Sequence, residues 1–175
     1  MEMLKKWILP LLLFLFLIVD GVLSKSLAPL LGDNAIIVPV QLSLIFQSLI
    51  AFYNPSNRYW VYVIIGIGLI GDIFYAGLIG INATLYAVIF YVIQINAKKF
   101  PDIKLARAFI VLMSTLGYQL SFGIMTLVFR IQTKSGLVYG LPAVLKTLIL
   151  TMILFFILDK LFVSYIKKYP FIKST

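Results

Sequence analysis

Two acidic residues lie in long apolar segments, where an ionisable side chain is costly. Asp20 follows the apolar stretch of residues 7–19, and Asp72 follows that of residues 59–71. A charge at membrane depth is tolerated only when it faces protein or water, so such a residue is a functional candidate. Because two buried carboxylates are also what an aspartyl protease uses for acid–base chemistry, a catalytic pair is the first hypothesis to consider.

The residues around the two acids do not support a catalytic pair. Intramembrane aspartyl proteases carry Tyr-Asp and Gly-x-Gly-Asp motifs, whereas Val19 precedes Asp20 and Leu69 stands where the first glycine of the second motif belongs. The chain has no Cys and no His, which excludes thiol nucleophiles, disulfides, HExxH zinc sites and rhomboid-type serine protease sites. We therefore predict no catalytic residue, no metal site and no cofactor.

Two basic residues are expected near the depth of these acids. Arg130 lies at the end of one apolar segment, and Lys146 lies about one turn into the last. Since an unpaired charge in the membrane is expensive, we predict that Asp20, Asp72, Arg130 and Lys146 form an ion-paired cluster near the outer face. The alternative is that Asp20 and Arg130 mark helix ends and meet water and headgroups.

Glycine is concentrated in one part of the chain. Residues 66–80 contain five of the eleven glycines. In membranes, small residues four apart allow helices to approach closely. Gly68, Asp72 and Ala76 share one such face, and Gly80 begins another. These faces pack either within the protein's own bundle or against a partner's helix.

Smaller polar side chains also fall within the apolar segments. We expect their hydrogen bonds to join neighbouring helices, and a ligand pocket is the alternative interpretation. These residues are Gln41, Gln47, Asn82, Gln94, Gln119 and Ser121.

The elements that must position these residues are membrane helices. The 175 residues are 62% hydrophobic and only 12% charged, with a mean hydropathy of +1.08, which excludes a water-soluble globule. A helix crosses the hydrocarbon with about 20 residues. We predict an all-α membrane protein, a six-transmembrane-helix bundle forming one domain over residues 1–175. Its spans are residues 7–23, 35–53, 59–76, 79–95, 105–129 and 141–163.

The net charge of +9 is explained by topology rather than by nucleic-acid binding. With the N-terminus in the cytoplasm, eleven of the fifteen basic residues lie inside and four lie outside. Both termini are then cytoplasmic, and the basic residues contact anionic lipids. The inner set is Lys5, Lys6, Arg58, Lys98, Lys99, Lys104, Arg107, Lys160, Lys167, Lys168 and Lys173.

Several of these features together resemble the MreD family of bacterial rod-shape-determining membrane proteins. The resemblance rests on a basic start, a first helix ending near Asp20-Gly21, Pro39 early in the second span, Gly68-Leu69-Ile70-Gly71-Asp72 with Gly80, and then Leu85-Tyr86. It implies a non-enzymatic scaffold of the cell-elongation complex in the bacterial plasma membrane.

The resemblance also implies partners and a fold. The partners would be an MreC-like single-span protein and, through it, the RodA glycosyltransferase, its transpeptidase and MreB filaments. The fold would be similar to the substrate-binding subunits of energy-coupling-factor transporters. A vitamin-binding subunit of that kind is therefore the alternative function, although residues 11–18 are bulky where those subunits carry an Ala-x-x-x-Ala face.

Overall fold

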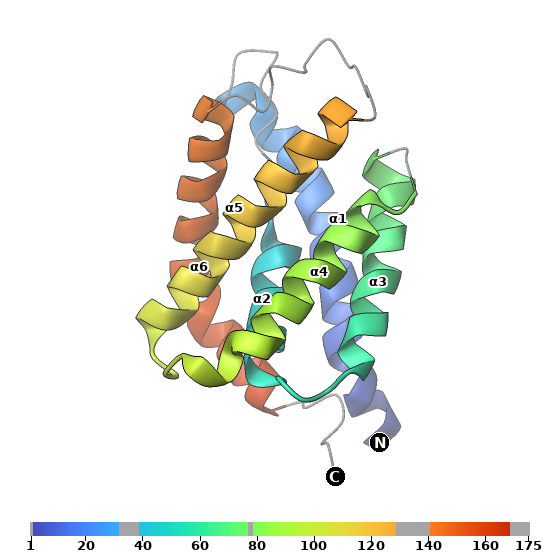
Figure 1. Cartoon of the computed structure of the whole chain (residues 1–175), viewed down its shortest axis with the longest axis vertical. Helices are drawn as coiled ribbons and strands as arrows, with labels where there is room; N and C mark the ends of the chain where they lie inside the picture. The colour runs from blue at the N-terminus through green and yellow to red at the C-terminus, as the bar shows by residue number, and fades with distance from the viewer. Residues whose placement is uncertain (1, 32–38, 77–78, 129–140, 169–175) are drawn as a thin grey trace.

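The computed structural model of the chain is built from helices packed into one bundle (Figure 1). It describes residues 2–31, 39–76, 79–128 and 141–168. The described elements are α1 (Glu2–Leu31), α2 (Leu42–Tyr53), α3 (Tyr59–Gly71), the π-helical turn η1 (Asp72–Ala76), α4 (Ile81–Asn96), the 3-10 turn η2 (Ala97–Lys99), α5 (Lys104–Val128) and α6 (Leu141–Lys168). The all-α prediction is confirmed, and the described residues form six α-helices, of which three are long and apolar enough to cross a membrane.

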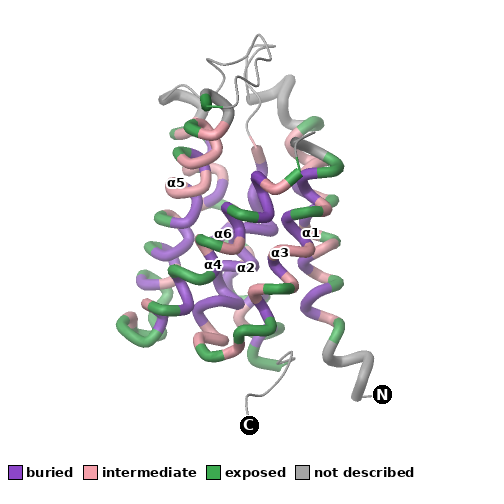
Figure 2. The backbone as a smooth tube through the Cα atoms, turned by 45° about the vertical axis from the view of Figure 1, so that its right-hand side comes forward, coloured by how far each residue is buried: buried purple, intermediate pink, exposed green. Residues whose placement is uncertain are grey.

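The short helix α2 forms the centre of the bundle. Every residue from Leu42 to Phe52 is buried, and α2 contacts α1, α4, α5 and α6. A helix that is hydrophobic on all sides is stable only when other elements surround it, which is how α2 is placed. Figure 2 shows the exposed residues on the outward faces of the surrounding helices, where lipid would contact them.

Aromatic side chains fill the space between α1, α2 and α6. The ring centroids of Phe16 and Phe46 are 5.2 Å apart, and those of Phe46 and Phe162 are 4.9 Å apart. Both pairs meet edge to face or nearly so, an arrangement that adds to the free energy gained by burying the rings. These contacts fix α1 and α6 against the central helix.

Only some of the six helices are long enough to cross a membrane. Trp7–Ser26, Lys104–Met125 and Val144–Lys168 are long and apolar enough, whereas Leu42–Tyr53 and Tyr59–Phe74 are shorter apolar helices. The predicted second span, residues 35–53, contains a helix of only 12 residues. At 1.5 Å per residue, α2 is about 18 Å long, so it begins partway through the bundle.

The late start of α2 has a local cause and a consequence. Pro39 and Val40 are not helical, and proline cannot donate the backbone hydrogen bond that an extended helix would need. The first N–H groups of α2 therefore lie inside the protein with no carbonyl of their own helix to bond. In a bilayer these groups need protein partners.

Candidate functional site

Asp20 supplies the partners that the start of α2 needs. Its carboxylate accepts the backbone N–H of Leu42 at 2.7 Å and that of Ser43 at 2.8 Å, and the Ser43 hydroxyl also donates to it. Gln41, at the N-cap position, makes no capping bond with its side chain. Asp20 on α1 therefore caps the N-terminus of α2 in place of a residue of α2 itself. Its negative charge is also favourable at the positive end of the α2 dipole.

Asp72 does the same for α4. Its carboxylate accepts the backbone N–H groups of Gly80 at 2.8 Å, Asn82 at 2.7 Å and Ala83 at 3.2 Å. Asp72 is fully buried at the first residue of the π-helical turn that ends α3. Both acids in the outer half of the predicted membrane are therefore bonded to backbone groups at helix starts.

Glycine allows the second hairpin to close around Asp72. A Cβ added to Gly68 would lie 2.4 Å from the Cα of Ala83, so α3 and α4 touch through their backbones. Gly80 has a φ of +108°, a left-handed conformation that favours glycine. Gly68 therefore serves packing within this chain's own bundle, which is one of the two roles expected from the sequence, whereas Gly80 serves the conformation of the turn.

The structure places the predicted cluster residues as follows. Asp20 and Asp72 are buried, Lys146 is exposed on α6, and Ala76 ends the π-helical turn. Arg130 lies outside the described residues. The hydrogen bonds that Asp20 and Asp72 make go to α2 and α4, so the ion-paired cluster of all four residues stays a prediction.

A third buried acid, Asp159, was missed by the sequence reasoning. It is 3% exposed, and its two oxygens accept both Nε and Nη2 of Arg107 at 2.9 Å. Arg107 also bonds Asp102 at 2.7 Å, and Asp102 bonds Lys167 at 3.1 Å. Asp159 falls inside the predicted span of residues 141–163, and that position alone was a signal of a paired acid.

The amide side chains divide into two groups. Asn82 accepts a hydrogen bond from the Tyr118 hydroxyl at 2.6 Å, and Gln94 donates to the carbonyl of Asn54 at 2.8 Å. The first of these bonds joins α5 to α4 and confirms the expected bonds between helices, whereas Gln94 bonds the segment between α2 and α3. Gln41, Gln47 and Gln119, by contrast, each have a buried amide atom without a hydrogen-bond partner among the described residues.

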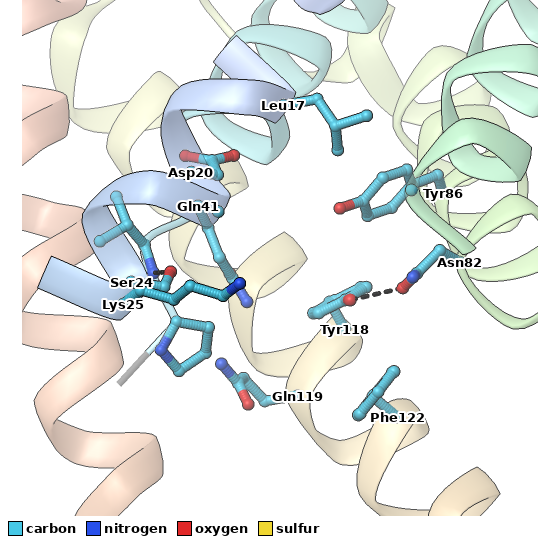
Figure 3. Close-up of a pocket in the computed structure, with 14 residues that line it drawn as sticks. Leu17, Asp20, Ser24, Lys25, Gln41, Asn82, Tyr86, Tyr118, Gln119 and Phe122 are labelled. Carbon is cyan, nitrogen blue, oxygen red and sulfur yellow. Dashed lines mark hydrogen bonds between the residues drawn. The ribbon is translucent and has the colours of Figure 1, made fainter. Parts of the chain in front are cut away.

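A cavity of about 290 Å³ lies between the end of α1, the start of α2, α4 and α5, and we call it the polar cavity because polar side chains are set into its mostly apolar walls. Figure 3 shows Gln41 and Gln119 reaching into it, with the Tyr118–Asn82 hydrogen bond at one side. The carboxylate of Asp20 lines the cavity, and Lys25 is exposed at its edge.

A second hollow is an open apolar groove between α4 and α5, with a volume of about 560 Å³. We call it the α4–α5 groove. Val88 and Val92 line it from α4, and Met113 lines it from α5. Ser114, Gly117 and Ser121 follow one another along α5 in the same groove, and a Cβ added to Gly117 would meet nothing within 4 Å.

Neither hollow carries a catalytic or metal-binding arrangement in the part of the chain that the structure describes. Within those residues there is no group of three or more Asp, Glu, His or Cys side chains that could hold a metal ion. The carboxylates nearest the polar cavity are already bonded to backbone N–H groups. What the arrangement offers is a polar binding space and an apolar contact surface.

Comparison with known proteins identifies one family. The family model described as rod shape-determining protein MreD matches residues 1–165, which is nearly the whole chain. No curated protein and no solved structure matches the chain. The match therefore covers both aspartate-capped hairpins, the polar cavity and the α4–α5 groove.

Proposed function

Because this chain belongs to the MreD family of rod shape-determining proteins, we propose that it is a non-enzymatic membrane scaffold that docks the membrane helix of an MreC-like partner. The family and the three long apolar helices support a membrane protein concerned with cell shape. Docking, and the link through the partner to RodA, its transpeptidase and MreB filaments, belong to the proposal.

The way in which the buried acids are used supports a scaffold. A general acid or base must reach a substrate proton, and its oxygens must be available for that bond. Asp20 and Asp72 each accept three hydrogen bonds from the starts of helices, and Asp159 is paired with Arg107. These carboxylates hold helices together, which is what a docking platform requires.

The α4–α5 groove is the observation that carries the docking proposal. Its walls include Val88, Val92 and Met113, which are 44–55% exposed. In lipid, helices associate through close packing over small residues rather than through hydrophobicity alone. Ser114 donates its hydroxyl to the Ile110 carbonyl, so the floor formed with Gly117 offers a smooth surface to a partner's helix.

The chain ends support the proposed topology in the plasma membrane. The start of α1 and the end of α6 lie at the same end of the bundle (Figure 1). The exposed Lys98 and Lys99 lie in η2, and Lys167 and Lys168 end α6. We propose that this end faces the cytoplasm, because basic residues favour that side.

A matched pair of variants tests the docking proposal. Gly117→Leu fills the α4–α5 groove, whereas Gly123→Leu adds the same side chain to α5 outside it, and neither glycine has a neighbour within 4 Å of an added Cβ. We expect the wild-type chain to co-purify with an MreC-like single-span protein in mild detergent. Gly117→Leu should reduce recovery about tenfold, and Gly123→Leu should leave it unchanged.

Two results contradict the proposal. One is the absence of such a partner when a tagged control complex survives the same detergent. The other is equal recovery of the partner with both variants. That result would show that the partner does not bind in the α4–α5 groove.

A vitamin-binding subunit with the fold of energy-coupling-factor transporter subunits is the second candidate. The polar cavity favours it, because Gln41 and Gln119 leave amide atoms available there. Native mass spectrometry of the purified chain separates the two functions. Retained flavin, thiamine or biotin would support the transporter subunit, and the scaffold predicts that none of them is bound.

A further inference from the structure

The polar cavity contains hydrogen-bonding groups that the protein itself leaves unused. Gln41 is 5% exposed and Gln119 is 3% exposed, and both line the cavity. Both amide atoms of Gln41 and the Nε2 of Gln119 lack a hydrogen-bond partner among the described residues. Because a buried, unsatisfied amide is costly, such atoms point to a ligand or to ordered water.

Several other polar groups around the cavity are already occupied. The Asp20 oxygens accept bonds from Leu42 and Ser43, and the Tyr118 hydroxyl donates to Asn82. The Ser24 hydroxyl oxygen accepts the backbone N–H of Val40 at 2.8 Å. The two glutamines and Lys25 therefore define the chemistry that the cavity offers.

This chemistry has a neutral part and a charged part. The buried Gln41 amide offers a donor and an acceptor together, which matches hydroxyl groups because each hydroxyl both donates and accepts. Lys25 lies exposed at the edge and provides a compact positive charge that suits a phosphate. A ligand with hydroxyls at one end and a phosphate at the other satisfies both parts.

The size of the cavity restricts the ligand further. A water molecule takes up about 30 Å³ in the liquid, so 290 Å³ holds roughly ten water-sized groups. That is the number of non-hydrogen atoms in glycerol phosphate. Leu17 and Phe122 add an apolar wall, which tolerates the carbon atoms of such a group.

We propose that the polar cavity binds a glycerophosphate group, with its hydroxyls on Gln41 and Gln119 and its phosphate beside Lys25. The group has two possible sources, soluble glycerol 3-phosphate and the headgroup of phosphatidylglycerol. This site is separate from the α4–α5 groove and does not depend on the docking of a partner.

Native mass spectrometry of the full chain in mild detergent tests this site with defined probes. Glycerol 3-phosphate is compared with inorganic phosphate, and phosphatidylglycerol is compared with phosphatidylcholine. Preferred binding of glycerol 3-phosphate assigns a soluble ligand, and preferred binding of phosphatidylglycerol alone assigns a lipid headgroup. Either result supports the proposal.

Variants locate the binding. Gln41→Leu and Gln119→Leu should each weaken binding of the preferred probe about tenfold. Lys25→Gln should weaken binding of glycerol 3-phosphate, or abolish the preference for phosphatidylglycerol over phosphatidylcholine. Gln47→Leu is the matched control, because Gln47 is also a buried, unsatisfied amide on α2 but does not line the cavity. It should leave binding unchanged.

Gln41→Leu could prevent folding, because Gln41 lies at the start of α2. Gln119→Leu then still tests the site, because Gln119 lies within α5. Three results would overturn the proposal. These are no adduct with either preferred probe, equal adducts with the two members of both probe pairs, and binding that Gln47→Leu weakens as much as Gln41→Leu does.

Discussion

The hairpins α1–α2 and α3–α4 each bury an aspartate that bonds the start of their second helix. Asp20 and Asp72 close similar Leu-Ile-x-Asp segments, but the residue four positions earlier differs. In the first hairpin it is Phe16, which packs on Phe46. In the second it is Gly68, which brings α3 against the backbone of α4.

The difference shows that a buried aspartate can cap the second helix of a hairpin both when the two helices are held apart by side chains and when their backbones touch. Aromatic rings separate α1 from α2, and the Ser43 hydroxyl adds a third hydrogen bond to Asp20. The tight second hairpin has backbone donors only, and it requires the left-handed Gly80 to deliver one of them. The second hairpin should therefore be the more sensitive to substitution.

The largest expected effect comes from removing the aspartates. Asp72→Ala leaves two buried N–H groups and one partly buried N–H group without their acceptor and should cost about 4 kcal/mol of folding free energy. Asp20→Ala should cost about 2–3 kcal/mol, because the unbonded Gln41 side chain is next to the same helix start. Reversible unfolding in detergent micelles measures both values. A larger loss at Asp20 would reverse the comparison.

The next largest effect tests the close contact between α3 and α4. Gly68→Ala places a Cβ 2.4 Å from Ala83 Cα and should cost about 2–3 kcal/mol, because the two helices must move apart. Gly66→Ala is the control on the same helix, with nothing within 4 Å of the added Cβ, and should stabilise α3 by about 0.5–1 kcal/mol. The same unfolding assay applies. Equal effects would show that α3 and α4 do not touch as described.

Gly80→Ala tests the turn that the second hairpin needs. A side chain at a φ of +108° is strained, so we expect a loss of about 1–2 kcal/mol. Hydrogen exchange should also accelerate at Asn82 and Ala83, whose N–H groups Asp72 accepts. Gly117→Ala, with an open environment and an ordinary helical backbone, should produce neither change.

The smallest effect is expected at Asp102, which is an exposed acid, unlike the buried Asp20 and Asp72. Hydrogen bonds from Tyr53, Lys167 and Arg107 lower the pKa of Asp102 below its ordinary value of 3.8. The stability it contributes is therefore complete above about pH 4 and is lost as the pH falls through the lowered pKa. Asp102→Asn should cost less than about 1 kcal/mol at pH 7 and reduce the acid sensitivity below pH 4. Unchanged acid unfolding would contradict this role.

The sequence predicts the number of helices and the burial of Asp20 and Asp72, because both follow from hydropathy and position. It does not predict what these acids bond. Their donors are backbone groups at 42–43 and 80–83, so the pairing depends on where α2 and α4 begin. The short α2 was also missed, because residues 35–53 are mostly apolar, although Pro39 was a local signal that the helix begins late.

Other parts of the site depend on packing that no pattern reports. Asp159 was not singled out from the sequence, where it lies next to Lys160. In the structure its ion pair with Arg107 joins α6 to α5. Asn82 and Gln41 have similar side chains, yet only Asn82 finds a partner among the described residues. The polar cavity therefore depends on how the helices are placed relative to one another, and the residue types alone do not predict it.

Site-specific photocrosslinking tests the scaffold account most directly. A photoreactive residue at Met113 lies in the α4–α5 groove, and one at Tyr62, which is 72% exposed on α3, faces outward elsewhere. The account predicts a crosslink to the membrane helix of an MreC-like protein from position 113 and none from position 62. A crosslink from position 62 alone, or from neither position while the two proteins co-purify, would contradict docking in the groove.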